Sequence, residues 1–126
     1  MPTIDLTRDS FEQVIAGNGI VVVDFWAPWC GPCRNFAPAF EASSELHADS
    51  VFAKVNTDEQ TELSGAFEIA SIPTLMIFRD QICVFSQPGA LPSDALEDLI
   101  QKVKALDMDD VRRQIEAHEA EEGASE

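Results

Sequence analysis

A buried strand that runs directly into a pair of cysteines constrains this chain more than any other feature. The run Ile20–Phe25 is almost entirely apolar and rich in β-branched residues, which is typical of a central strand covered on both faces. Trp26-Ala27-Pro28-Trp29-Cys30-Gly31-Pro32-Cys33 follows it, and a helical pattern comes next. The two cysteines are therefore predicted at a strand-to-helix corner, where a CxxC pair indicates thiol–disulfide exchange.

Strand and helix patterns alternate along most of the chain. We expect strands at residues 3–6, 20–26, 51–55, 75–78 and 82–85, and helices after Thr7, over 34–46, after Asp58 and from Pro92 to Leu106. Thr7 and Asp58 are candidate helix caps, and Gln87-Pro88-Gly89 is a candidate turn. This order predicts an α/β fold, a central mixed sheet flanked by helices.

Residues 1–106 are expected to form one domain, and residues 107–126 an acidic helical extension. Asp107 is a candidate cap for a second helix with a weak apolar stripe of Met108, Val111 and Ile115. From His118 onward the chain is acidic and rich in small residues, so we expect it to be frayed.

The charge argues against two classes of partner. The net charge is -15, and residues 107–126 hold eight acidic residues against two arginines. Such a field repels phosphate backbones and anionic lipid, so neither nucleic acid nor a membrane is expected as a partner. The N-terminus lacks the pattern of a secretory signal peptide, which favours a cytoplasmic location. We expect a monomer.

Cysteine usage favours redox chemistry over a structural role. Three cysteines are too few for a secreted disulfide framework, and the CxxC lacks the second pair that a structural zinc site requires. His47 and His118 lie far from it in sequence, so no metal is expected. Cys83, in the last predicted strand, is expected to be a small buried residue.

The residue types at the corner suggest a division of labour. Cys30 precedes a helix, whose unpaired N–H groups and dipole favour a thiolate, so Cys30 is the candidate nucleophile. Cys33 follows three residues later on the same face and is expected to be the more buried, resolving thiol. Pro32 cannot donate a backbone hydrogen bond, which weakens thiolate stabilisation and favours a reductant over an oxidant.

Asp24 interrupts an apolar strand, and two interpretations are open. If it is buried, its pKa rises toward neutrality and it becomes a candidate general base. If it lies at the end of the strand, it is a solvent-facing acid.

The quoted motifs together resemble the thioredoxin family over about residues 3–106. They are Val23–Cys33, Pro38, Ile72-Pro73-Thr74 and Gly89-Ala90. The resemblance implies the thioredoxin fold and reduction of disulfides in other proteins. It also implies electrons from NADPH through a thioredoxin reductase, and no bound cofactor other than a redox-active Cys30–Cys33 disulfide. The turn at residues 79–81 departs from the family pattern, because it lacks the usual glycine.

The same resemblance implies roles for individual residues. Asp24 would accept the proton of Cys33, and Lys54 would pair with Asp24. Pro73 would be cis, and the backbone of Ile72 would pair with an extended substrate. The residues expected at the substrate surface are Trp29, Gly31, Pro32, Ile72, Pro73, Gly89 and Ala90, with Trp26 either beside them or in the core.

Two other functions are considered. The chain could be a thioredoxin-like binding module that docks a partner through its C-terminal extension. It could also be an oxidase or isomerase, which Pro32 and the lack of a signal peptide disfavour.

Overall fold

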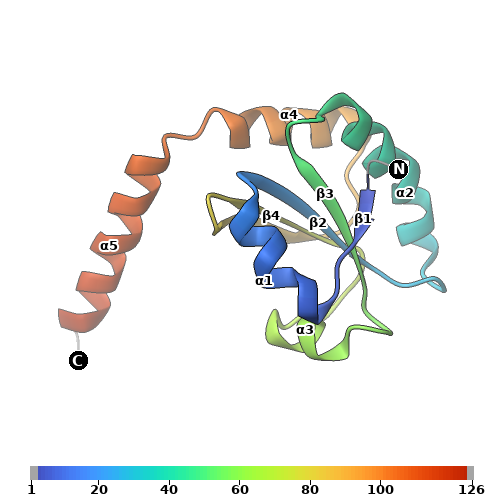
Figure 1. Cartoon of the computed structure of the whole chain (residues 1–126), viewed down its shortest axis with the longest axis horizontal. Coiled ribbons are helices and arrows are strands. Elements are labelled where there is room, and N and C mark those ends of the chain that lie inside the picture. The colour runs from blue at the N-terminus through green and yellow to red at the C-terminus, as the bar shows by residue number, and fades with distance from the viewer. Residues whose placement is uncertain (1–2, 125–126) are drawn as a thin grey trace.

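The computed structural model describes residues 3–124 as a five-stranded mixed sheet between two layers of helices (Figure 1). The strands are β1 Thr3–Asp5, β2 Ile20–Trp26, β3 Val51–Asn56, β4 Thr74–Arg79 and β5 Ile82–Pro88. The helices are α1 Arg8–Gly17, α2 Gly31–Leu46, α3 Thr61–Ala66, α4 Ser93–Lys104 and α5 Met108–Ala124. The predicted fold class and element order are confirmed.

Strand β2 lies at the centre of the sheet, which has the order β1-β3-β2-β4-β5. Strands β1, β3 and β2 are parallel, whereas β4 and β5 are antiparallel to their neighbours. Five consecutive residues of β2, residues 21–25, are buried, because helices cover both faces of the sheet.

Each face of the sheet has its own apolar core. Helices α1 and α3 pack on one face, through Ile15 and Leu63, against the odd-numbered residues of β2. Helices α2 and α4 pack on the other face, through Phe40 and Ile100, against Val22. Since side chains alternate along a strand, Asp24 lies on the same face as Val22, the face that α2 covers.

The two predicted helix caps have different outcomes. Thr7 caps α1 as expected, in a reciprocal pair of hydrogen bonds with Ser10. The cap predicted at Asp58 is wrong, because α3 begins at Thr61 after Gln60, which makes no side-chain cap. Asp58 instead accepts a hydrogen bond from Trp29, the residue before Cys30.

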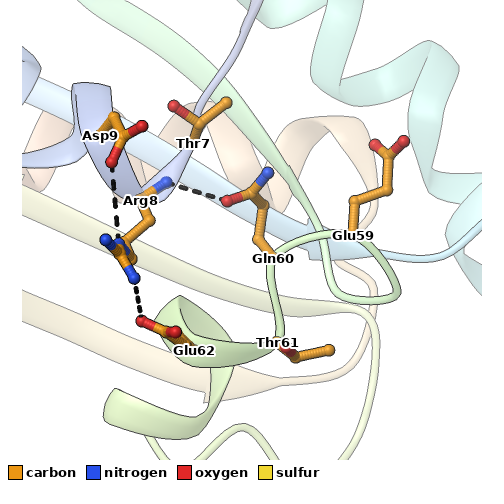
Figure 2. Close-up of a pocket in the computed structure, with 7 residues that line it drawn as sticks. All are labelled: Thr7, Arg8, Asp9, Glu59, Gln60, Thr61 and Glu62. Atoms are coloured by element: carbon orange, nitrogen blue, oxygen red, sulfur yellow. Dashed lines mark hydrogen bonds and ion pairs between the residues drawn. The ribbon is translucent and has the colours of Figure 1, made fainter.

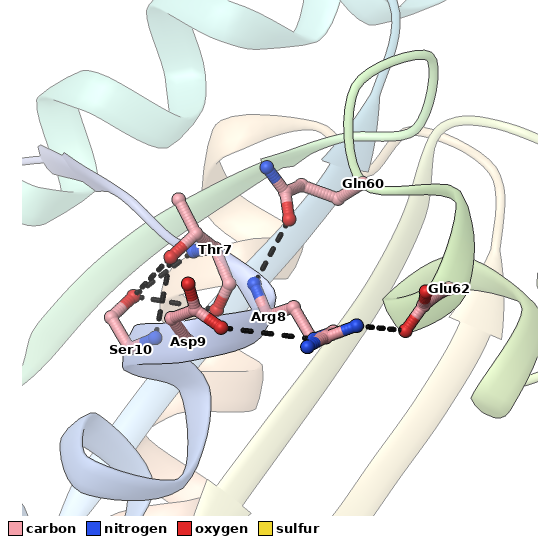
Figure 3. Close-up of polar contacts among 6 residues, drawn as sticks. All are labelled: Thr7, Arg8, Asp9, Ser10, Gln60 and Glu62. Carbon is pink, nitrogen blue, oxygen red and sulfur yellow. Dashed lines mark hydrogen bonds and ion pairs between the residues drawn. The ribbon is translucent and has the colours of Figure 1, made fainter.

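A polar cleft of about 410 Å³ lies where the first turns of α1 and α3 meet (Figure 2). Residues that line the cleft bond to one another. The Arg8 backbone N–H donates to Gln60 Oε1 at 2.9 Å, and the Arg8 guanidinium pairs with Glu62 and Asp9 (Figure 3). These contacts join two helices that cover the same face of the sheet. We interpret the cleft as a structural joint between them.

A buried histidine joins the helices on the opposite face. His47, at the C-terminal end of α2, accepts a hydrogen bond at Nδ1 from Lys104 Nζ at 2.7 Å. An ammonium group is only a donor, so the proton of the neutral ring lies on Nε2, which donates to Glu97 at 2.7 Å. The hydrogen bond from His47 holds the pKa of Glu97 below its ordinary value. This network fixes the C-terminal end of α2 against α4.

The chain departs from the sequence expectations at several element ends. Helix α2 begins at Gly31 rather than Arg34, because Cys30 caps it. Strand β5 continues through Pro88, where a turn was predicted, and an edge strand tolerates a proline that lacks an N–H. The expectation of fraying from His118 is wrong as far as Ala124, since α5 is continuous to that residue. Residues 125–126 lie outside the described residues.

The β4–β5 turn uses two non-glycine residues in the left-handed region. Asp80 has φ 51° and Gln81 has φ 70°. A two-residue hairpin turn of this kind favours glycine, because side chains with a Cβ are strained at positive φ. The missing glycine is therefore a local cost to stability.

We expect Gln81→Gly to stabilise the protein by about 1 kcal/mol and to raise Tm by about 4 °C. Glycine relieves the Cβ strain at φ 70°, and Gln81 is exposed, so no packing is lost. Gln13→Gly is a matched control, because Gln13 is an exposed residue inside α1, where glycine destabilises. Thermal unfolding should move in opposite directions for the two variants. A lower Tm for Gln81→Gly would show that the turn is not strained.

Candidate active site

Cys30 and Cys33 form a disulfide at the N-terminal end of α2, with their Cα atoms 5.2 Å apart. Cys30 is the N-cap residue, and its Sγ accepts a hydrogen bond from the Cys33 backbone N–H at 3.2 Å. The sulfur that we predict to be the nucleophile therefore already occupies the position where a helix stabilises negative charge. The expected difference in burial is small in this oxidised form, with 4 % exposure for Cys30 and 2 % for Cys33.

Pro32 lies in the first turn of α2, between the two cysteines, and is exposed. It has no backbone N–H, so the first turn offers one donor fewer to the Cys30 sulfur. Gly31, which precedes it, is only partly exposed and is the first residue of the helix.

Asp24 is fully buried, and neither of its carboxylate oxygens has a hydrogen-bond partner among the described residues. Burial raises the pKa of Asp24 to about 7, against an opposing attraction from Lys54. The interpretation as a solvent-facing acid is therefore wrong. A carboxyl group with this pKa is half ionised near neutral pH and can both take up and release a proton.

Lys54 lies beside Asp24 on the neighbouring strand, because the two residues are partners in the register of β2 and β3. Its ammonium group lies 4.7 Å from the centre of the Trp26 ring. This contact is a cation–π interaction rather than the direct ion pair with Asp24 that the resemblance implied. Trp26 is half-buried, with no hydrogen-bond partner for its buried Nε1 among residues 3–124.

The Ile72–Pro73 peptide bond is cis and lies against the disulfide. Ile72 and Ala27 pack against the two cysteines, and the Ile72 carbonyl oxygen lies 3.8 Å from Cys30 Sγ. The Gly89 N–H donates to the Pro73 carbonyl at 2.8 Å, with Gly89 at φ 102°, a conformation that favours glycine. Ile72, Pro73 and Gly89, which were predicted for the substrate surface, thus form one connected segment beside Cys30, and Ala90 is exposed.

Trp29, which was predicted at the substrate surface, is 68 % exposed. Its indole Nε1 donates to Asp58 Oδ2 at 3.0 Å, so the side chain is exposed but held in place. Sequence reasoning missed Asp58 here, because an acid after a strand also fits a helix cap. It also missed Arg34, whose guanidinium donates to the Pro28 carbonyl at 2.7 Å and braces the loop before Cys30.

The expectation that Cys83 is buried is wrong. Cys83 is a free and exposed cysteine on β5, the edge strand of the sheet. Partial burial raises the pKa of its thiol, so this thiol is less ionised than an ordinary cysteine. It lies outside the cluster that surrounds the disulfide.

Two further findings concern the whole described chain. Within residues 3–124, no three or more His, Cys, Asp and Glu side chains gather in a way that could hold a metal ion. None of the helices in the same range combines the length and the apolar character needed to cross a bilayer.

The chain is similar to thioredoxins in sequence. The family model described as "Thioredoxin" matches residues 2–102. A Streptomyces coelicolor protein named "Putative thioredoxin 2" is 50% identical over 121 residues, which cover 96% of this chain and 90% of that protein. That match therefore extends into α5. A thioredoxin from Alicyclobacillus acidocaldarius is 48% identical over 96 residues, covering 75% of this chain and 91% of the relative.

Solved structures agree with the sequence relatives. A thioredoxin from Plasmodium falciparum superposes with a TM-score of 0.73 at 37% identity, covering 79% of this chain and 97% of that one. A mutant thioredoxin from Halobacterium salinarum gives 0.75 at 34% identity, covering 82% and 91%. The Cys30–Cys33 disulfide lies at the N-terminus of α2, as a CxxC redox site requires. This chain therefore belongs to the thioredoxin family of thiol–disulfide oxidoreductases.

Proposed function

We propose that this chain is a cytoplasmic protein-disulfide reductase that a thioredoxin reductase returns to the dithiol form with electrons from NADPH. The observation that supports this most is the position of Cys30 as the cap of α2, with the Cys33 N–H directed at its sulfur. A thiol in that position is readily ionised, and only the thiolate attacks a disulfide.

The proposed reaction has two exchange steps. In the dithiol form, the Cys30 thiolate attacks one sulfur of a substrate disulfide, forms a mixed disulfide and releases the first substrate thiolate. The Cys33 thiol then loses its proton and its sulfur attacks Cys30 Sγ, which restores the Cys30–Cys33 disulfide and releases the second substrate thiolate. Two electrons pass to the substrate, and the reductase supplies two electrons to restore the dithiol.

We assign Asp24 as the group that takes the proton of Cys33, directly or through a water molecule. Asp24 lies on the sheet face that α2 covers, and α2 carries Cys33. Its pKa of about 7 suits a base that must also give the proton up later. Lys54, over the Trp26 ring and beside Asp24 in the sheet, favours the ionised carboxylate.

Substrate contact is assigned to the surface around Cys30. Ile72 contacts the Cys30 sulfur, and Gly89 bonds to Pro73, whose peptide bond with Ile72 is cis. Trp29, Gly31 and Pro32 flank Cys30 in sequence, and Ala90 follows Gly89, so these residues complete the proposed surface. The Ile72 backbone would pair with an extended substrate chain as an added strand, which would make recognition broad because main-chain groups are common to all sequences.

The test is coupled turnover. We expect this chain, a bacterial thioredoxin reductase and NADPH together to reduce a disulfide-bonded model protein, with NADPH oxidised in a 1:1 ratio to disulfides broken. Omission of this chain should reduce the rate to background. A chain that instead speeds disulfide formation in a reduced protein, and accepts no electrons from the reductase, would identify an oxidase.

A further inference from the structure

A groove of about 540 Å³ lies between α5 and the edge strand β5. Its apolar lining comes from Ile82 and Val84 of β5, Leu106 before α5, and Val111 and Ile115 of α5. Among residues 108–122 of α5, Met108 alone is buried, at 6 % exposed. Ile115, two turns later, is 37 % exposed. The apolar stripe of α5 therefore faces a space that this domain does not fill.

The start of α5 is held firmly, which fixes where the helix leaves the domain beside β5. The Arg79 guanidinium at the end of β4 donates to the carbonyl oxygens of Val103 and Leu106, both at 2.7 Å. It thereby caps α4 and fixes the α4–α5 connection at once. Asp107 then caps α5 by accepting from the Asp110 N–H at 3.2 Å. The extension is a helix anchored at one end, and Figure 1 shows it outside the layers of the domain.

The outer half of α5 is strongly acidic. Its two arginines, Arg112 and Arg113, pair with acids of the first turn. Beyond them the helix has four glutamates and no lysine or arginine. Glu119 and Glu122 line the groove together with His118, whose Nε2 lies 2.9 Å from Glu122 Oε1. Carboxylates near the C-terminal end of a helix oppose its dipole, and those spaced three residues apart repel one another. A cation bound beside this half of α5 would relieve both effects.

The groove is remote from the redox site. Ile82 pairs with Arg79, and Arg79 pairs with Ile20 at the start of β2. Cys30 follows the other end of β2, beyond Trp26. A protein bound in the groove would therefore leave the surface around Cys30 free.

We propose that this groove docks a segment of a partner protein in which one or two large apolar side chains lie next to lysines or arginines. The apolar side chains would occupy the lining around Ile115, and the basic residues would face Glu119 and Glu122. A second copy of this chain is a poorer occupant, because each copy has a net charge of -15 and brings an equally acidic α5. Docking of this kind would hold a partner beside a domain whose redox site stays accessible.

The test is selection of a displayed library of random 16-residue peptides on the full chain. We expect enriched peptides that place Leu, Ile, Phe, Trp or Met beside Lys or Arg. A synthetic copy of the most enriched peptide should bind the wild-type chain at least about tenfold more tightly than Ile115→Asp, because a charge replaces the apolar contact. The double variant Glu119→Lys with Glu122→Lys should bind at least about tenfold more weakly too, and binding should weaken as salt increases.

The chain offers matched controls for both changes. Ile4→Asp makes the same substitution at an exposed isoleucine, 40 % exposed, in β1 at the opposite edge of the sheet. The double variant Glu12→Lys with Glu45→Lys makes the same charge change at exposed residues of α1 and α2. Neither control should alter peptide affinity, and Ile115→Asp should keep wild-type disulfide reduction, which shows that the domain is intact.

Three results would overturn the proposal. Enrichment that is equal on wild type and Ile115→Asp would show that the groove binds no peptide, and enrichment of acidic peptides would show that the charge argument is wrong. Sedimentation of a dimer that Ile115→Asp dissociates would assign the groove to a second copy. None of these depends on redox turnover, so failure of the proposed reductase activity is a separate outcome.

Discussion

Replacing Cys33 by serine should leave a chain that attacks disulfides once and then stops as a covalent mixed disulfide through Cys30. The Cys30 sulfur occupies the N-cap position of α2 and is stabilised as a thiolate there, whereas serine at position 33 cannot complete the exchange. Turnover should fall by at least ~10³-fold, as is common when half of a covalent catalytic pair is removed. Intact-mass measurement after incubation with a disulfide-bonded protein would detect the adduct.

The exposed thiol of Cys83 must be removed in this experiment. Cys83 can form a mixed disulfide of its own, although its raised pKa keeps most of it protonated at neutral pH. The variants Cys33→Ser and Cys30→Ser should therefore be compared in a Cys83→Ser background. We expect the adduct with Cys33→Ser and no adduct with Cys30→Ser. Equal trapping by both would mean that the roles assigned to the two cysteines are reversed or shared.

Asp24→Asn should change the pH dependence of stability more than any other single substitution of an acid in the described chain. The folded chain holds a proton on Asp24 up to a pKa of about 7, whereas the unfolded chain releases it near 3.8. Between these pH values the folded state binds one more proton, so its free energy of unfolding falls as pH rises, by about 1.4 kcal/mol per pH unit. The accumulated loss is about 4 kcal/mol by pH 7 and changes little above it. Asparagine does not ionise, so the variant avoids this loss.

Chemical denaturation of the oxidised chain from pH 4 to 8 would measure this difference. Asp24→Asn and wild type should diverge between pH 4 and 7 and run parallel above pH 7. Asp5→Asn is the control, because Asp5 is exposed, lies level with Asp24 and Lys54 in the sheet, and loses the same charge. Curves for Asp24→Asn and wild type that stay parallel throughout would show that the carboxyl is not desolvated as the structure indicates.

The same substitution should slow disulfide exchange on the alkaline side of neutrality. There the wild-type Asp24 is ionised and can accept the proton of Cys33, which asparagine cannot do. We expect a loss of at least about tenfold in rate above pH 7 and a smaller loss at pH 6, where Asp24 already holds a proton. Equal rates for both forms across pH 6–9 would remove Asp24 from the mechanism.

The central part of the fold could be predicted because local signals and burial agree there. The run before the cysteines became β2 with the predicted bounds, since an apolar run rich in β-branched residues is typical of a strand covered on both faces. Thr7 capped α1 because a hydroxyl at that position satisfies free N–H groups whatever the tertiary context. The site could be identified for two reasons. Cys30 and Cys33 form a reactive CxxC pair, and Asp24 is a carboxylate that is costly to bury in an apolar strand.

The remaining features depend on contacts between segments that are distant in sequence. Asp58 could cap a helix or accept a hydrogen bond from an indole. Only the fold brings the Trp29 Nε1, 29 residues away in sequence, to 3.0 Å from its carboxylate. The exposure of Cys83 follows from the position of β5 at the sheet edge, which strand patterns do not reveal. The length of α5 was underestimated because its acidic half has little apolar character. The start of α5 is also held by a distant residue, since Arg79 bonds to the carbonyl of Leu106, 27 residues later in the sequence.

The reduction potential of the Cys30–Cys33 pair tests the reductase assignment most directly. It can be measured by equilibrating the chain with a dithiol–disulfide buffer of known potential and quantifying the oxidised fraction. Pro32 withholds a donor from the Cys30 thiolate, so we predict a value more negative than about -230 mV, below the range of glutaredoxins. A value less negative than this, toward the -180 to -120 mV typical of isomerases and periplasmic oxidases, would contradict the assignment.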